Sequence, residues 1–210
     1  GLQSALSGES SPPGRSRLID LQDHLIVPGL LGFTNVGYRW HKRSWKPLAV
    51  SLRGRTVVVT GATSGLGRAA ASQLAELGAR VILVGRNPEK AEATRREIVA
   101  ATGNDNVAVA LADLSLLADV RKLAQRLLEA EPRIDVLVNN AGVLLNQRTT
   151  TAEGNETALA TNLLAPYLLT QMLLPRLRES APSRIINVSS GGMYATGLAL
   201  DDLQYEKGAY

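Results

Sequence analysis

The sequence has no cysteine, only two histidines (His24 and His41) and few aromatic residues, which make up 4% of its 210 positions. The absence of cysteine excludes disulfides, thiolate nucleophiles and cysteine-ligated metals. Neither histidine is accompanied by a cluster of acidic residues, so no metal site is expected. With so few aromatic side chains, the core has to be built from Leu, Ala, Val and Ile.

The length and composition indicate one globular domain preceded by an extension. Apolar residues make up 45% of the chain and charged residues 20%, both in the ordinary range for a soluble protein. Residues 1–17 are rich in Ser, Gly and Pro and are predicted to be disordered. The apolar run at 25–33 is too short to span a membrane. We therefore expect a partly disordered, basic extension over 1–51 and a domain over 52–210. The sequence leaves the compartment open between the cytoplasm and the mitochondrion.

Residues 38–55 carry basic side chains and no acid. The basic residues are Arg39, Lys42, Arg43, Lys46, Arg53 and Arg55. The chain has a net charge of +4 and this segment contributes +6, so the remainder carries −2. Two interpretations are open: a solvated basic connector, or peripheral contact with an anionic membrane or partner through Trp40 and Trp45. Nucleic acid is not an expected partner, because no recognition motif accompanies the basic residues.

From residue 52 onward, short apolar runs alternate with segments of helical pattern. Strands are predicted at 56–60, 81–85, 107–115, 134–142 and 184–190, and helices at 65–78, 88–103, 116–132 and 153–179. Strands that are apolar throughout are typical of a parallel sheet covered on both faces. The alternation predicts an α/β fold of right-handed βαβ units, a doubly wound Rossmann-type sheet.

A glycine-rich turn, TGATSGLG at 60–67, joins the first predicted strand to the first predicted helix. Gly61, Gly65 and Gly67 allow positive φ, close approach of a diphosphate, and tight packing of the helix on the strand. The free N–H groups at the start of the helix favour a phosphate. The turn therefore indicates a dinucleotide site, and the alternative is a tight turn with no ligand.

The residue after the second predicted strand bears on the choice of dinucleotide. An acidic side chain there would bind the ribose 2′-hydroxyl of NAD, but this sequence has Arg86. A guanidinium can pair with a 2′-phosphate, so the sequence favours NADP over NAD. The alternative is an ordinary surface arginine.

Together these motifs resemble the short-chain dehydrogenase/reductase superfamily. The resemblance rests on the TGATSGLG turn, Asp113-Leu114, the Asn139-Asn140-Ala141-Gly142 segment, Asn162, and Asn187-Val188-Ser189-Ser190, in the order and spacing of that family. The segment DDLQYEK at 201–207 is similar to the retinol-dehydrogenase-like branch.

The resemblance implies a set of cofactor-binding residues. They are Gly61, Thr63, Ser64, Gly65, Leu66, Gly67, Arg86, Asp113, Leu114, Asn140, Ala141 and Gly142. By this resemblance Asp113 accepts a hydrogen bond from the adenine amino group, Leu114 covers the ring, and the Asn139–Gly142 segment lines the adenosine side. The alternative for Asp113 is a residue at a helix N-terminus.

The resemblance also implies two catalytic residues. Asn162 would bend the long helix and position a proton-relay water, and Ser190 would donate a hydrogen bond to the substrate oxygen. Their alternatives are an amide on a helix face for Asn162 and a turn former at a strand end for Ser190.

The resemblance implies a catalytic tyrosine and lysine four residues apart on one helix face, and no Tyr-x-x-x-Lys pair is expected in this chain. Tyr194 and Tyr205 are not followed by lysine at the fourth position, and Tyr210 is the last residue. We therefore expect the chain to stop before its active-site helix and later strands. Residues 185–188 would then form an exposed apolar edge strand.

Two functions follow as hypotheses. The first is the cofactor-binding portion of an NADP(H)-dependent enzyme that transfers hydride between nicotinamide and an alcohol or carbonyl substrate of lipophilic character, in a homo-oligomer. The second is a non-catalytic, nucleotide-binding subunit of a larger assembly.

Overall fold

The structure, a computed structural model, describes residues 38–39, 42–44, 50–190, 197 and 199–207. The chain divides into two units, residues 1–49 and 50–210, and the strands and helices below all belong to the second. The disorder predicted for residues 1–17 and the two tryptophans at 40 and 45 lie outside the described residues. The proposed division at residue 51 stays a prediction.

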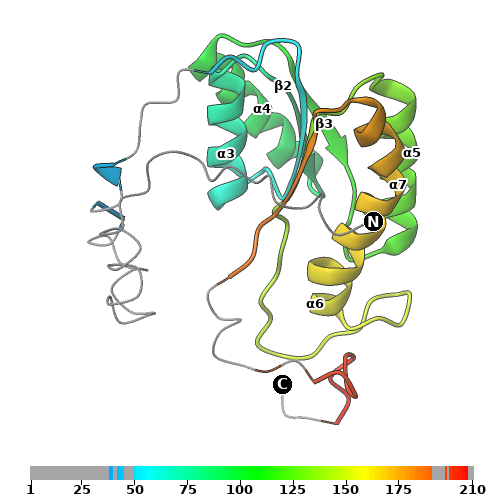
Figure 1. Cartoon of the computed structure of the whole chain (residues 1–210). Helices are drawn as coiled ribbons and strands as arrows, with labels where there is room; N and C mark the ends of the chain where they lie inside the picture. Colours follow the sequence, from blue (N-terminus) through cyan, green and yellow to red (C-terminus); the bar gives the residue numbers. More distant parts are fainter. Residues whose placement is uncertain (1–37, 40–41, 45–49, 191–196, 198, 208–210) are drawn as a thin grey trace, which may run out of the picture. The chain divides into compact units, whose positions relative to one another are not determined.

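Five parallel strands form a single sheet in the order β3-β2-β1-β4-β5 (Figure 1). The strands are β1 (Thr56–Thr60), β2 (Arg80–Gly85), β3 (Val107–Leu111), β4 (Val136–Asn139) and β5 (Arg184–Asn187). The order runs outward from β1 in both directions, which is the doubly wound arrangement predicted from the sequence. The predicted fold class is confirmed.

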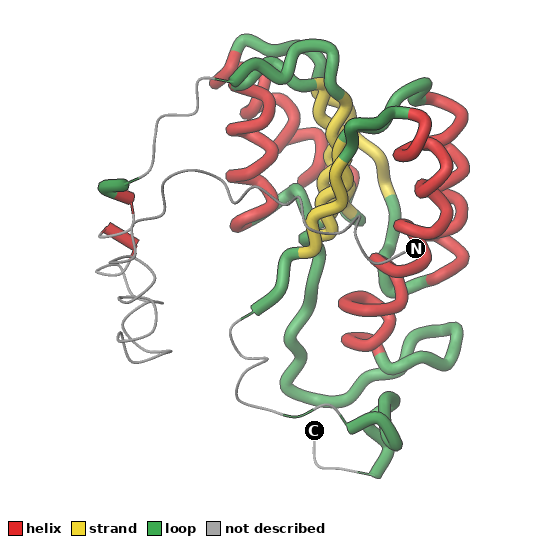
Figure 2. The backbone as a smooth tube through the Cα atoms, in the orientation of Figure 1, coloured by secondary structure: helices red, strands yellow, loops and turns green. Residues whose placement is uncertain are grey.

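Helices cover both faces of the sheet (Figure 2). They are α3 (Gly65–Glu76), α4 (Pro88–Thr102), α5 (Leu117–Ala130), and a continuous segment of α6 (Thr157–Leu159), the π-helical turn η1 (Ala160–Leu164) and α7 (Ala165–Glu179). Alternate residues of β1 point to opposite faces. Val57 and Val59 pack with α3 and α4, and Val58 packs with α5 and α7.

The boundaries of α4 follow from its sequence. Asn87 accepts a hydrogen bond from the backbone N–H of Lys90 at 2.7 Å, and Pro88 occupies the first helical turn. Gly103 ends the helix with φ of +67°, a conformation that glycine adopts without steric cost. The predicted helix at 88–103 is therefore confirmed with its start and stop signals.

Three predicted strands are longer than the observed ones. The strands predicted at 107–115, 134–142 and 184–190 pair only over Val107–Leu111, Val136–Asn139 and Arg184–Asn187. Beyond each strand the chain turns away from the sheet at its carboxyl end, where parallel strands have their exit loops. The predicted helix 153–179 begins only at Thr157, because Glu156 is the N-cap and its carboxylate accepts from the N–H groups of Ala158 and Leu159.

Ion pairs lie at the amino ends of the strands. The buried carboxylate of Asp135 accepts from the guanidinium groups of Arg55 (2.6 Å) and Arg133 (2.7 Å), and from the N–H of Thr56 (2.9 Å). Burial alone would raise the pKa of Asp135, but these three hydrogen bonds together outweigh it and hold the pKa below its ordinary value. Arg80 binds the buried Glu131 through two hydrogen bonds of 2.8 and 2.7 Å. We refer to these five side chains as the amino-edge ion pairs.

The segment Thr157–Glu179 is long and apolar enough to cross a membrane by length and composition, with mean hydropathy of 1.2. Part of that apolar character has a place in the fold, since Leu169, Leu173 and Leu177 are buried in the core beneath the sheet. Leu163 and Tyr167 point outward and are exposed. On β5, Ile185 and Ile186 are also exposed, as the sequence predicted for this edge strand.

Candidate functional site

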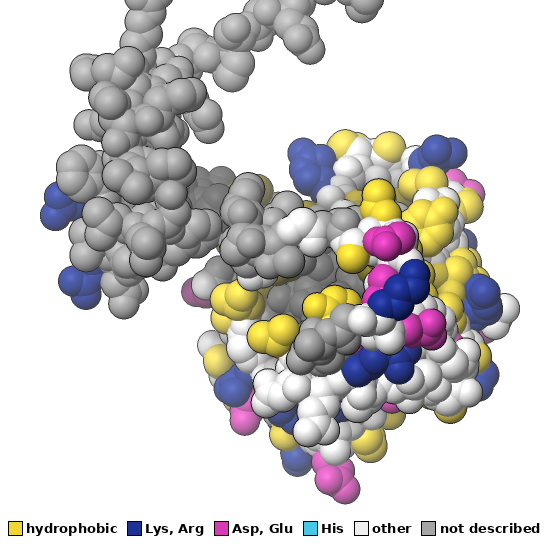
Figure 3. Space-filling model, turned by 90° about the horizontal axis from the view of Figure 1, so that it is seen from below, with side chains coloured by type: hydrophobic (Ala, Val, Ile, Leu, Met, Phe, Trp, Pro, Cys, Tyr) yellow, Lys and Arg dark blue, Asp and Glu magenta, His cyan; other side chains and the backbone are white. Residues whose placement is uncertain are grey.

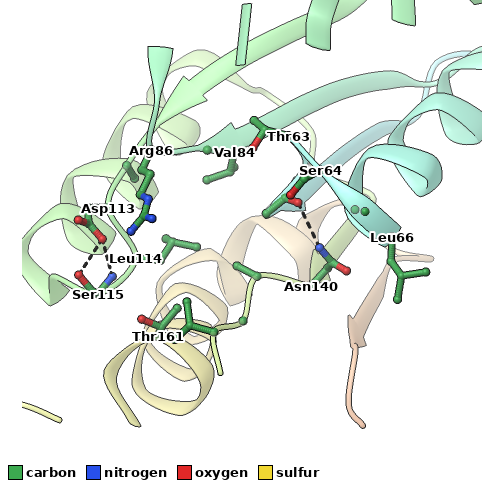
Figure 4. Close-up of a pocket in the computed structure, with 18 of the residues that line it drawn as sticks. Thr63, Ser64, Leu66, Val84, Arg86, Asp113, Leu114, Ser115, Asn140 and Thr161 are labelled. Atoms are coloured by element: carbon green, nitrogen blue, oxygen red, sulfur yellow. Dashed lines mark hydrogen bonds between the residues drawn. The ribbon is translucent and has the colours of Figure 1, made fainter. Parts of the chain in front are cut away.

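A cleft of about 460 Å³ opens at the carboxyl ends of β1, β2 and β4. It is lined by the glycine turn, by the loops that follow β2, β3 and β4, and by Thr157 and Thr161 of the α6–η1 segment. Figure 4 shows residues that line the cleft. Ligands of open parallel sheets bind at this edge, where the strand order reverses. Figure 3 views the same edge and shows hydrophobic side chains interspersed with acidic and basic ones on the described surface.

All twelve residues predicted to bind the cofactor line this cleft. They are Gly61, Thr63, Ser64, Gly65, Leu66, Gly67, Arg86, Asp113, Leu114, Asn140, Ala141 and Gly142. They come from four loops that are far apart in the sequence, so their convergence depends on the strand order rather than on any local motif. Their roles toward a bound cofactor stay predictions.

The glycines of the turn are required by close approach of the backbone. Gly61 has φ of +64°, and a Cβ at this position would lie 2.8 Å from Cα of Ala141. A Cβ on Gly67 would overlap the carbonyl oxygen of Gly61 and the side-chain amide of Asn140. The glycine turn therefore packs directly against the segment that follows β4.

Thr60 joins the ends of β1 and β4, a role that the sequence analysis missed. Its buried hydroxyl accepts from the N–H groups of Asn140 (2.9 Å) and Ala141 (3.0 Å) and donates to the carbonyl of Val138 (3.2 Å). In return, the side-chain amide of Asn140 donates to the carbonyl of Thr60 at 2.9 Å. The sequence did contain a signal for this role, because a threonine ends the buried apolar strand immediately before the glycine turn.

The start of α3 faces the cleft, and no side chain among the described residues caps its first N–H groups. Ser64 is extended and makes no side-chain cap, and the first turn contains no acidic residue. These groups and the positive end of the helix dipole favour an anion at this position. Leu66 lies beside them and is 76% exposed.

Arg86 and Asp113 lie at the other end of the cleft, with Leu114 next to them (Figure 4). Oδ1 of Asp113 accepts from the N–H (2.9 Å) and the hydroxyl (2.7 Å) of Ser115, which fixes the carboxylate. Within the described residues, Arg86 forms no ion pair and Oδ2 of Asp113 accepts no hydrogen bond. This end of the cleft therefore presents one cationic group and one acceptor beside an apolar side chain.

The two predicted catalytic residues lie outside the lining of this cleft. Asn162, in the π-helical turn, accepts from the N–H of Val143 and donates to its carbonyl, both at 2.8 Å. Its side chain therefore fixes the loop that follows the Asn139–Gly142 segment. Ser190 is an exposed residue just beyond the end of β5. Their proposed catalytic roles stay predictions.

A Tyr-x-x-x-Lys spacing does occur in the chain, at Tyr38 and Lys42, and the sequence analysis overlooked it. Lys42 Nζ lies 5.7 Å from the centre of the Tyr38 ring. The pair precedes the first strand and belongs to the unit 1–49, so it is not at the place in the sequence where the family has its catalytic pair. Among the described residues, no group of three or more His, Asp or Glu side chains could hold a metal ion.

The sequence profile described as short chain dehydrogenase matches residues 55–197 of this chain. The chain belongs to the short-chain dehydrogenase/reductase family, a family of oxidoreductases. Its resemblance to the retinol-dehydrogenase-like branch is confirmed by the relatives that follow.

Two curated relatives and one solved structure illustrate the match. The chain is 40% identical to dehydrogenase/reductase SDR family member 12 of Bos taurus over 88% of this chain and 59% of that protein. It is 45% identical to retinol dehydrogenase 11 of Homo sapiens over 75% of this chain and 50% of that protein. A metagenomic short-chain oxidoreductase in complex with NADP is 42% identical, with a TM-score of 0.59, over 66% of this chain and 63% of that one. The chain thus spans about half the length of the curated relatives it matches.

Proposed function

We propose that this chain is the cofactor-binding part of an NADP(H)-dependent oxidoreductase that interconverts an alcohol and a carbonyl compound. One observation carries the proposal: the start of α3, which no side chain caps, and the guanidinium of Arg86, which forms no ion pair with the described residues, lie at opposite ends of one cleft. A dinucleotide with a 2′-phosphate presents negative charge at both of these places. The NADP complex of the metagenomic relative supports the same choice.

The residues present fit such a cofactor. The glycine turn and the N–H groups of α3 bind the diphosphate, and Arg86 pairs with the 2′-phosphate of the adenosine ribose. Oδ2 of Asp113 accepts from the adenine amino group, and Leu114 covers the ring. When bound, the nicotinamide supplies hydride transfer to or from a substrate carbon. Ser190 donates a hydrogen bond to the substrate oxygen, which stabilises the charge that develops there.

The substrate is proposed to be a lipophilic alcohol or carbonyl compound. This follows from the similarity to retinol dehydrogenase 11 and from the exposed Leu66 at the mouth of the cleft. We further propose a homo-oligomer, and peripheral contact of residues 38–55 with an anionic membrane. Of the basic residues in this segment, Arg39, Lys42, Arg43 and Arg53 are described and exposed, whereas Arg55 is bound to Asp135.

Replacing Arg86 with alanine tests the cofactor. We expect Arg86→Ala to weaken NADPH binding by about 10- to 100-fold, the value of a charged hydrogen-bonded pair of roughly 1.5–3 kcal/mol. NADH lacks the 2′-phosphate, so its affinity should change little. Fluorescence titration of the two reduced coenzymes measures both dissociation constants.

Arg121→Ala is the matched control, since Arg121 is an exposed arginine on α5 outside the lining of the cleft. It should leave both affinities unchanged. Equal losses of NADPH and NADH affinity in Arg86→Ala would contradict the choice of NADP. An absence of binding by either coenzyme to the unmodified protein would contradict the proposed function.

A further inference from the structure

Two buried side-chain atoms have no hydrogen-bond partner among the described residues: Oδ1 of Asn139 and Oγ1 of Thr161. Asn139 is 6% exposed and Thr161 is 7% exposed. Leaving a buried polar atom unpaired is costly, and native proteins almost always satisfy such atoms with protein groups or ordered water. Both atoms therefore need an explanation.

The two residues line the same small cavity behind the cofactor cleft. The cavity has a volume of about 10 Å³, and its other walls include Thr60, Leu114, Ala165 and Leu169. That volume is about what the centre of a single water molecule requires. An occupant this small has to be polar, because the atoms that lack partners on the wall are an amide oxygen and a hydroxyl.

Neighbouring protein groups are already engaged. The side-chain nitrogen of Asn139 donates to Oγ1 of Thr170 (3.1 Å) and to Oδ1 of Asn187 (2.9 Å), so both of its hydrogens are used. The hydroxyl of Thr60 accepts two hydrogen bonds and donates a third. It has no capacity left for either orphaned atom.

We propose that one water molecule binds in this cavity and bridges Asn139 to Thr161. It donates one hydrogen to Oδ1 of Asn139, which has only acceptor capacity left, and bonds the hydroxyl of Thr161 as donor or acceptor. A site with two polar partners and room for one molecule meets the requirements for structural water.

This water positions the floor of the cleft. Asn139 ends β4 immediately before the Asn140–Gly142 segment, and Thr161 lies in the π-helical turn next to Asn162. Asn162 in turn holds the loop after Gly142 through both hydrogen bonds to Val143. The water would therefore connect the end of β4 to the π-helical turn, whose Asn162 holds the loop at Val143. This connection does not depend on which coenzyme occupies the cleft.

The sign of a stability change tests the proposal in solution. Thr161→Val replaces the hydroxyl by a methyl group of similar size. If the water is bound, this change removes a hydrogen bond and should lower the folding equilibrium constant of the natural full-length protein roughly tenfold. If the cavity is dry, the change removes an unsatisfied hydroxyl and should raise that constant. Urea unfolding of the two proteins measures it.

Thr94→Val is the matched control. Thr94 is 3% exposed, and its hydroxyl donates to the carbonyl of Lys90 at 2.9 Å. Thr94→Val removes a buried hydroxyl that has a hydrogen-bond partner. If the water is bound, Thr161→Val and Thr94→Val should therefore both lower the stability of the protein. A more stable Thr161→Val beside a less stable Thr94→Val would overturn the proposal.

A high-resolution crystal structure of the natural full-length protein provides the direct measurement, even where the valine variant fails to fold. We expect an electron-density peak within hydrogen-bonding distance of Oδ1 of Asn139 and Oγ1 of Thr161. The same peak should persist in Thr161→Ser, which keeps the hydroxyl. A cavity without a peak, or a Thr161 hydroxyl turned to bind the coenzyme directly, would overturn the proposal.

Discussion

Gly67→Ala is expected to lower the stability of the protein by about 3 kcal/mol, at the upper end for an added methyl group in a packed site. The added Cβ would overlap the carbonyl of Gly61 and the amide of Asn140, and neither can move freely. The amide of Asn140 is held by the carbonyl of Thr60, so relief of the overlap has to displace the glycine turn from β4. Because that displacement distorts the diphosphate site, NADPH affinity should fall as well. Urea unfolding and coenzyme titration measure the two effects.

Gly197→Ala is the control for this substitution. A Cβ at Gly197 would meet no atom of the described part of the chain within 4 Å, so stability and coenzyme affinity should both remain at the level of the unmodified protein. Wild-type stability and wild-type NADPH affinity in Gly67→Ala would show that the approach of the turn to β4 is not as close as described here.

Asp135→Ala should destabilise the fold by about 2–3 kcal/mol at neutral pH, because it breaks a buried charge interaction and leaves the N–H of Thr56 without its acceptor. This is below the 3–5 kcal/mol typical of broken buried pairs, since Arg55 and Arg133 are themselves 38% and 42% exposed and can turn to water. Urea unfolding of the variant and the unmodified protein at pH 7 measures the difference.

The same interaction predicts a pH dependence. The pKa of Asp135 is lower in the folded protein than its ordinary value of 3.8. Its contribution is therefore complete above pH 3.8 and is lost as the pH falls below that value and through the folded-state pKa. The stability difference between the unmodified protein and Asp135→Ala should shrink over that interval.

Glu92→Ala provides the comparison, since Glu92 forms a partly exposed ion pair with Arg95 within α4, in contrast to the buried carboxylate of Asp135. Exposed pairs contribute little, so this variant should unfold close to the unmodified protein at pH 7. If Asp135→Ala behaves like Glu92→Ala at pH 7, the amino-edge ion pairs do not stabilise the fold in the way their burial indicates.

The fold was predictable because each strand is a continuous apolar run and each helix has its own local signals. The doubly wound parallel arrangement followed from the alternation of strands and helices, whereas the order β3-β2-β1-β4-β5 comes from the structure. The ends of the strands were not predictable, because pairing decides them: Asp113 and Ser115 continue the predicted third strand but bind each other in a turn. The π-helical turn at Ala160–Leu164 was also missed, since it interrupts an otherwise regular helical pattern.

The cofactor cleft was largely predictable for a different reason. Its glycines, Arg86 and Asp113 each stand at the carboxyl end of a predicted strand, so the sheet brings them together. The function of Glu131 was not predictable, because it depends on Arg80, a partner from a different part of the chain. The same holds for Asn162, whose bonds to Val143 require the loop conformation to be known.

The amino-edge ion pairs lie at the amino ends of the strands, and the cleft lies at their carboxyl ends, on the opposite edge of the same sheet. Stability and coenzyme preference are consequently expected to respond to separate charged side chains: Arg55, Arg80 and Asp135 for the first, and Arg86 for the second. A library confined to the charged side chains of the amino edge should therefore leave coenzyme preference intact, which makes this edge a suitable starting point for stepwise laboratory evolution.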